Sequence, residues 1–62
     1  RFAGMTTNER IFAAGIRIEF DAAARRNDRA ELVRLLIAVD LPAAQAEVAA
    51  DAVLADPARF GL

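Results

Sequence analysis

The sequence predicts an all-α domain of three main helices, the first of which could be broken at Gly15 into two. Apolar residues recur at helical steps of three and four along most of the chain. Thr6 with Glu9, and Asp28 with Glu31, have the spacing of a capping box at a helix start. No stretch alternates with a period of two and the β-branched content of a strand, so we expect no sheet.

The first helical segment begins at Thr6 and carries two adjacent apolar stripes. In a continuous helix, these stripes would be Ile11, Gly15, Ile18 and Ala22, and beside them Phe12, Ile16, Phe20 and Ala23. Together they would cover more than half of the helix circumference. Arg17 and Asp21 lie four residues apart on the polar remainder, which predicts an ion pair.

Gly15 leaves two interpretations of this segment open. Glycine often follows the last turn of a helix, where the backbone becomes left-handed, so Gly15 could end a short first helix. It could also be a point of close contact inside one long helix. We favour a break or kink at Gly15, with the helix resuming at once.

Two further helices are expected after the turn at Asn27 and Asp28. The first runs from about residue 29 to residue 39 and is mostly apolar, which makes it the core helix. Pro42 suits the start of the next helix, which runs from about residue 43 to residue 54. Pro57 ends that helix, because proline disfavours helical geometry in the residue before it, and residues 57–60 are expected to form a last turn.

The expected core combines the large apolar residues of all these segments. Its members are Phe12, Ile16, Phe20, Leu32, Leu35, Leu36, Val39, Leu41, Val53, Leu54 and Phe60. We expect residues 5–62 to form a single helical domain that starts naturally at Met5. Residues 1–4 are interpreted as tag or processing residues and are left out of the fold argument.

The composition argues against an enzyme. The chain has no His, Cys, Ser, Lys, Tyr or Trp, the types from which most nucleophiles, general bases and metal ligands are drawn. We therefore expect no catalytic residue, no metal site and no cofactor. Acidic residues could still bind Mg²⁺ or Ca²⁺, but their spacing lacks the density of a calcium loop. These residues are Asp21, Asp28, Asp40, Glu47, Asp51 and Asp56.

The shortness of the chain favours a partner. A domain of 62 residues buries only about 60% of the surface that its unfolded chain exposes, and such domains often need disulfides, a metal or association for stability. Without Cys or His, association is the remaining route. If one stripe of the first segment faces the following helices, the other is exposed as an apolar patch. We predict a homodimer, or contact with another protein, through Phe12, Gly15, Ile16 and Phe20.

An alternative function uses the basic cluster of Arg25, Arg26 and Arg29. Guanidinium groups beside a helix start could hold a phosphate, either as an anion site or as a nucleic-acid contact. Asp28, as the cap, competes for the same backbone N–H groups. The helix pair of residues 29–54 could also be a helix-turn-helix motif, but no basic residue lies between Arg34 and Arg59 and the net charge is −1. Nucleic acid is therefore the less favoured partner.

Two resemblances add to this interpretation. From Leu41-Pro42 to Asp56-Pro57-Ala58-Arg59-Phe60, the chain resembles the last helices of ubiquitin-associated-type three-helix domains. Where that family has a Met-Gly-aromatic loop, this chain has Val39-Asp40-Leu41, so the resemblance implies a mode of packing and not ubiquitin binding. The chain also resembles short bacterial all-helical proteins of unknown function, in residues 8–15, 19–21 and 55–61, which implies no particular activity.

The location is predicted from hydropathy. No run approaches the roughly 20 apolar residues of a membrane span. No positively charged stretch followed by an apolar stretch marks a signal peptide. We therefore expect a cytoplasmic protein with no membrane contact.

Overall fold

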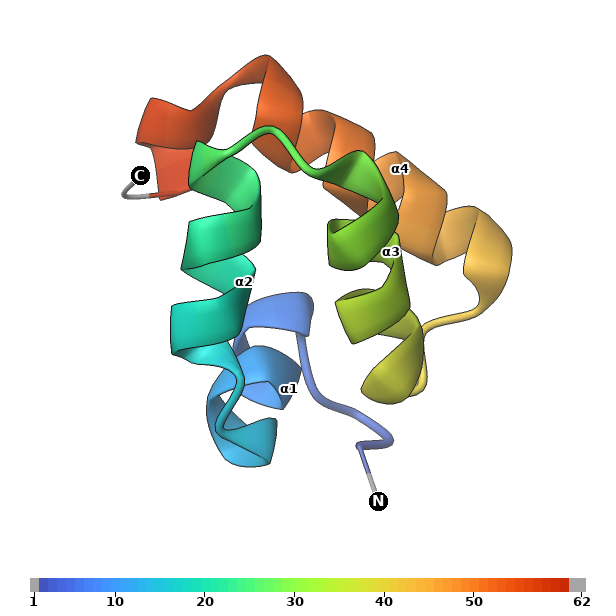
Figure 1. Ribbon diagram of the computed structural model, residues 1–62. Helices are drawn as coiled ribbons and strands as arrows, with labels where there is room; N and C mark the ends of the chain where they lie inside the picture. Colours follow the sequence, from blue (N-terminus) through green and yellow to red (C-terminus); the bar gives the residue numbers. More distant parts are fainter. Residues whose placement is uncertain (1, 61–62) are drawn as a thin grey trace.

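Between residues 2 and 60, the chain folds into four α-helices and a 3-10 turn that follows them. The computed structural model describes residues 2–60, apart from the side chains of residues 59 and 60. The helices are α1 (Thr7–Ala14), α2 (Arg17–Arg25), α3 (Arg29–Ala38) and α4 (Ala43–Ala55), and the 3-10 helix is η1 (Pro57–Phe60). In Figure 1, α3 lies between α2 and α4, and α1 crosses the end of α2 that is remote from η1. The all-α class is confirmed, but the count of three main helices is wrong because the first segment forms two.

Gly15 causes this difference, as one of the two interpretations of the sequence expected. Its backbone is left-handed, with φ 71° and ψ 25°. The Gly15 N–H donates to the carbonyl of Phe12 at 3.1 Å, and the Ile16 N–H donates to the carbonyl of Ile11 at 3.3 Å. These two hydrogen bonds satisfy the last carbonyls of α1 and turn the chain away from the helix axis. The helix then resumes at Arg17 in a new direction.

The ends of α2 and α3 repeat the same turn with Asn27 and Asp40 in place of glycine. Their φ angles are 58° and 70°. Asn and Asp tolerate the left-handed region better than other side chains do. In each turn the next N–H reaches back to the helix: Asp28 donates to the carbonyl of Ala23 at 2.9 Å, and Leu41 to that of Leu36 at 3.2 Å. Three tight turns therefore fold four short helices back on one another.

One of the two predicted capping boxes forms completely. The Thr6 N–H donates to Glu9 Oε1 at 2.9 Å, and the Glu9 N–H donates to Thr6 Oγ1 at 3.2 Å. At the start of α3, the Glu31 N–H donates to Asp28 Oδ1 at 3.1 Å. The reciprocal bond does not form, since the Asp28 N–H donates to the carbonyl of Ala23 at 2.9 Å and the carboxylate of Glu31 accepts from Arg34 Nε at 2.7 Å.

The core is built around α3, which packs most extensively against α4 and also against α2. Leu32 and Leu36 of α3 and the adjoining Val39 are the largest fully buried side chains. The facing side of α4 supplies Ala46 and Ala50, whose small side chains let the two helix backbones approach closely. This arrangement confirms the prediction that the helix from about residue 29 to residue 39 is the core helix.

Most of the predicted core residues are buried, and one is not. The confirmed members are Phe20, Leu32, Leu35, Leu36, Val39, Leu41 and Val53. Ile16 and Leu54 are half-buried against the core. The prediction for Phe12 is wrong, because its side chain is 82% exposed. The turn at Gly15 removes Phe12 from the face that carries Phe20. The side chain of Phe60 lies outside the described residues.

Two residues that the core prediction omitted help to attach α1. Phe2 and Ile11 are buried in the core cluster. The packed structure thus includes part of the segment before Met5, whose origin as a tag stays a prediction. Arg10 adds a polar link, since its Nη1 donates to the carbonyl of Val39 at 3.0 Å, at the C-terminal end of α3. A cation suits this end of a helix, where unsatisfied carbonyls concentrate partial negative charge.

Replacing Gly15 tests the break. An added Cβ would meet no heavy atom within 4 Å, so Gly15→Ala costs only the left-handed backbone conformation. We expect this change to lower the free energy of unfolding by about 1 kcal/mol, measured by urea denaturation. Gly15→Asn should cost less, because Asn tolerates this conformation. A stabilisation by Gly15→Ala of about 0.5–1 kcal/mol would instead indicate a continuous helix through residue 15.

Candidate interaction site

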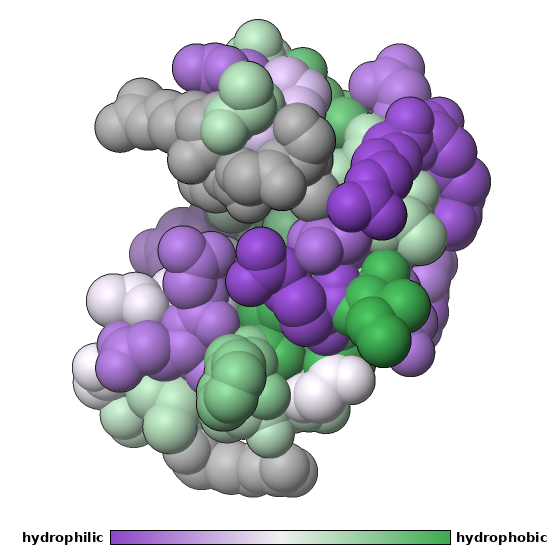
Figure 2. Space-filling view, turned by 90° about the vertical axis from the view of Figure 1, so that its left-hand side faces the viewer, coloured by the Kyte–Doolittle hydropathy of each residue, from purple (hydrophilic) through white to green (hydrophobic). Residues whose placement is uncertain are grey.

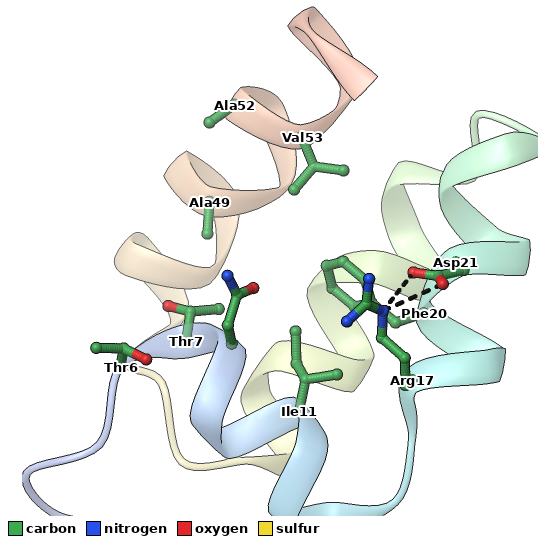
Figure 3. A pocket seen from close by; sticks show the side chains of 10 residues that line it. Thr6, Thr7, Ile11, Arg17, Phe20, Asp21, Ala49, Ala52 and Val53 are labelled. Atoms are coloured by element: carbon green, nitrogen blue, oxygen red, sulfur yellow. Dashed lines mark hydrogen bonds and ion pairs between the residues drawn. The ribbon is translucent and has the colours of Figure 1, made fainter. Parts of the chain in front are cut away.

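An apolar groove of about 330 Å³ opens between α1, α2 and α4 (Figure 3). Ile11 of α1, Phe20 of α2 and Val53 of α4 point into it from three sides. Ala49 and Ala52 line the α4 wall, and their short side chains leave the groove open. Its volume lies at the lower end of the range of small-molecule sites, about 300–1,000 Å³. It is therefore large enough for a bulky side chain or a small ligand.

The rim of the groove is polar. Thr6 and Thr7 lie on one side, at the start of α1, and the ion pair of Arg17 with Asp21 lies on the other (Figure 3). Arg17 Nε donates to both carboxylate oxygens of Asp21 at 3.1 Å, as the four-residue spacing predicts. No hydrogen bond within the described part of the chain uses the two terminal amino groups of Arg17. These donors are available to an incoming acceptor.

Phe12 stands directly beside the groove. It lines a second, shallower hollow on the outer side of α1 with Met5, Asn8, Glu9, Ala13 and Arg17. Asn8 and Arg17 border both hollows. Because successive helical residues are about 100° apart, Phe12 projects outward while Ile11 points into the groove. A protruding aromatic ring and an apolar groove thus lie next to each other on one helix.

The break at Gly15 divides the predicted interface residues. Phe12 and Gly15 are exposed, Ile16 is half-buried, and Phe20 belongs to the core. Phe20 nevertheless forms part of the groove wall, so an occupant of the groove would touch it. The four residues therefore do not form one continuous exposed stripe.

Ile18 is an exposed residue that the sequence analysis missed. A continuous helix would place Ile18 on the same stripe as Ile11, but Ile11 is buried and Ile18 is 83% exposed. Counting helical steps separately on each side of Gly15 would have found it. In Figure 2, which shows the left-hand side of Figure 1, green apolar residues stand among purple polar ones and do not merge into one broad patch.

The basic cluster is mostly paired within the chain. Arg26 Nε contacts Asp28 Oδ2 at 3.1 Å. Arg29 links α3 to α4, with its Nε 2.7 Å from Asp51 Oδ1 and its Nη2 3.6 Å from Glu47 Oε1. Arg25 has no hydrogen bond or ion pair within the described residues. The sequence analysis missed the contact between Arg29 and Asp51 because it joins residues far apart in the chain.

The same contacts influence the acidic side chains. The Glu31 N–H, and after it Arg26, lower the pKa of Asp28. The hydrogen bond from Arg29 lowers the pKa of Asp51, and that from Arg34 lowers the pKa of Glu31. Carboxylates with lowered pKa values stay ionised at neutral pH and do not serve as general acids. Among the residues described, no three acidic side chains gather closely enough to hold a metal ion.

Acid should destabilise the fold. The pKa values of Glu9, Asp28 and Asp51 are lowered from the ordinary values of 4.5 for Glu and 3.8 for Asp. Their stabilising contribution is complete above those ordinary values and is lost as the pH falls through the lowered ones. We expect the urea concentration at the midpoint of unfolding to decrease as the pH is lowered from about 5 to about 2.

Asp28→Asn provides a matched variant, because the amide oxygen can still cap α3 while the titrating charge is gone. This variant should lose less stability on acidification than the original chain does. A urea midpoint that rises as the pH falls would contradict the assignment of these contacts.

Comparison with protein-family models, with curated proteins and with solved structures finds no significant match to this chain. The two resemblances noted in the sequence therefore stay predictions. In the part of the chain that the structure describes, no helix has the length and apolar content needed to cross a membrane.

Proposed function

We propose that this chain is a small, non-enzymatic protein-interaction module that self-associates as a homodimer through the surface of α1 and α2 around Phe12. The observation that carries the proposal is the position of Phe12, which is 82% exposed and lies beside an apolar groove. Contiguous exposed apolar surface and largely apolar grooves are typical of interaction sites, and Phe12 places exposed apolar surface next to such a groove.

The energetics support an association through Phe12. Full burial of a Phe side chain is worth about 1.5–3 kcal/mol, a large share of the few kcal/mol that so small a core supplies. The formal net charge of −1 produces little repulsion between two copies. Apolar burial therefore favours association and charge opposes it only weakly, but the buried surface must also offset a loss of translational and rotational freedom of about 4–15 kcal/mol.

The proposed surface differs from the one that the sequence predicts. It retains Phe12 and Gly15 as exposed residues and adds Ile18, which lies on the outer side of α2. Phe20 contributes only through the groove wall. Ile16 is half-buried against the core, so it supports the position of α1 and α2 more than it contacts a partner.

The expected affinity is modest. A standard interface buries about 800 Å² on each partner, about a fifth of the 3984 Å² accessible surface of this chain. A smaller contact centred on one aromatic side chain belongs to the weak class of interfaces. We expect a dissociation constant on the order of micromolar.

Contact with an anion or a nucleic acid through Arg25, Arg26 and Arg29 is the less favoured function. Two of these three arginines already contact carboxylates of the same chain. A phosphate would have to compete with Asp28 and Asp51 for their guanidinium groups. Association around Phe12 would not require an ion pair within the chain to be broken.

Phe12→Asp should abolish self-association. A charge at this position would be desolvated in the interface without a partner, so the variant should sediment as a monomer at all concentrations from about 1 μM to 1 mM. The average molar mass of the original chain in solution should increase with concentration over this range. Its dissociation constant should change little between about 0.1 M and 1 M salt, because burial of apolar surface dominates.

Val48→Asp is the matched control, because Val48 is also well exposed, at 70%, but lines neither hollow. It should associate as the original chain does. The proposal fails if the original chain is monomeric throughout, or if both Asp variants associate equally well.

A further inference from the structure

We infer that the groove between α1, α2 and α4 receives the Phe12 side chain of a second copy, and that the two copies exchange these side chains reciprocally. The inference rests on the proposed self-association and names its central contact. It assigns the groove one occupant, the aromatic ring that protrudes beside it on every copy.

The chemistry of the groove suits an aromatic ring. Ile11, Phe20 and Val53 form apolar walls, and Ala49 and Ala52 leave space on the α4 side. Phe20 would meet the incoming ring as an offset or edge-to-face pair, the arrangement that two aromatic rings prefer. The protruding ring would exchange an exposed position for contacts on several sides.

The positions of the ring and the groove allow a closed dimer. Asn8 and Arg17 border both the groove and the hollow beside Phe12. The surface that presents the ring and the surface that receives it are therefore neighbours. A two-fold axis close to these residues would place each Phe12 in the opposite groove at the same time. A ring and a groove on opposite sides of the molecule would instead produce an open chain of subunits.

Charged groups of both signs border the two surfaces: Glu9 and Arg17 at the hollow beside Phe12, and Arg17 with Asp21 at the groove. Glu9 lies beside Phe12, and Arg17 lies at the rim of the groove. Insertion of Phe12 would bring Glu9 of one copy toward Arg17 of the other. One carboxylate oxygen of Glu9 accepts from Thr6, and neither its other oxygen nor the terminal amino groups of Arg17 enter a hydrogen bond among the described residues. In such a contact, the free carboxylate oxygen of Glu9 could accept from a terminal amino group of Arg17 while Arg17 Nε stays paired with Asp21.

Ile18 is a poorer candidate for the inserted side chain. It is as exposed as Phe12 but lines neither the groove nor the neighbouring hollow. Ile18 would contribute at most to the periphery of the dimer.

Two variants that remove the ring or fill the groove test the exchange by complementation. Phe12→Ala removes the ring and leaves the groove intact. Ala52→Leu fills the groove and leaves the ring intact, and both positions are exposed on helices where Ala and Leu are favourable. Ala44→Leu is the matched control on an exposed position of α4 that does not line the groove.

In sedimentation experiments, we expect the dimers of Phe12→Ala and of Ala52→Leu each to have a dissociation constant at least about tenfold higher than that of the original chain. Ala44→Leu should associate normally. An equimolar mixture of Phe12→Ala and Ala52→Leu should associate more tightly than either variant alone, because the mixed dimer restores one complete ring-in-groove contact.

The outcomes separate this inference from the proposed function. If Phe12→Ala is monomeric while Ala52→Leu associates normally, the dimer forms around Phe12 without the groove, and only the inference is overturned. If both variants lose association and the mixture does not recover it, the inference is also overturned. If the original chain is monomeric at all concentrations, the inference and the proposed function both fail, and the groove serves another molecule.

Discussion

The left-handed backbone of Gly15 is the constraint on which the arrangement of this molecule depends. It ends α1 after eight residues and sets α2 in a new direction. Without this turn, Phe12 and Phe20 would lie on one face, and both would be buried or both exposed. With it, Phe20 enters the core and Phe12 projects into solvent, while Ile11 and Ile18 separate in the same way. One backbone conformation thereby creates a packed interior, a groove and an exposed ring beside it.

Small side chains and short-range polar contacts complete the structure. Alanines on α4 allow close packing against α3, and they also leave the groove unfilled where α4 passes α1 and α2. Arg10 ties the start of the chain to the end of α3, and Arg29 ties α3 to α4. In a chain without cysteine, and so without disulfides, these contacts help to hold helices of eight to thirteen residues that would be marginal alone. Burial of the exposed Phe12 against a second copy is the further stabilisation that we propose.

Much of the fold could be predicted from the sequence because its signals are local. The capping box of Thr6 with Glu9, the ion pair of Arg17 with Asp21 and the position of α3 each depend on residues a few steps apart. The sequence places Phe12 both in the expected core and on an exposed apolar patch, and it cannot decide between the two because the direction in which the chain resumes after Gly15 depends on the tertiary fold. The contact of Arg29 with Asp51 joins two helices and requires the tertiary fold. The groove was not predicted for the same reason, since its walls come from three helices.

The central claim is that the turn at Gly15 presents Phe12 to the groove of a second copy. Isotope-filtered NMR on an equal mixture of labelled and unlabelled chains tests it most directly, because it detects only contacts between molecules. The account predicts intermolecular contacts from the Phe12 ring to the methyl groups of Ala52 and Val53. Contacts of Phe12 only with Phe12 of the other copy, or none from Phe12 at a concentration where the chain is dimeric, would contradict it.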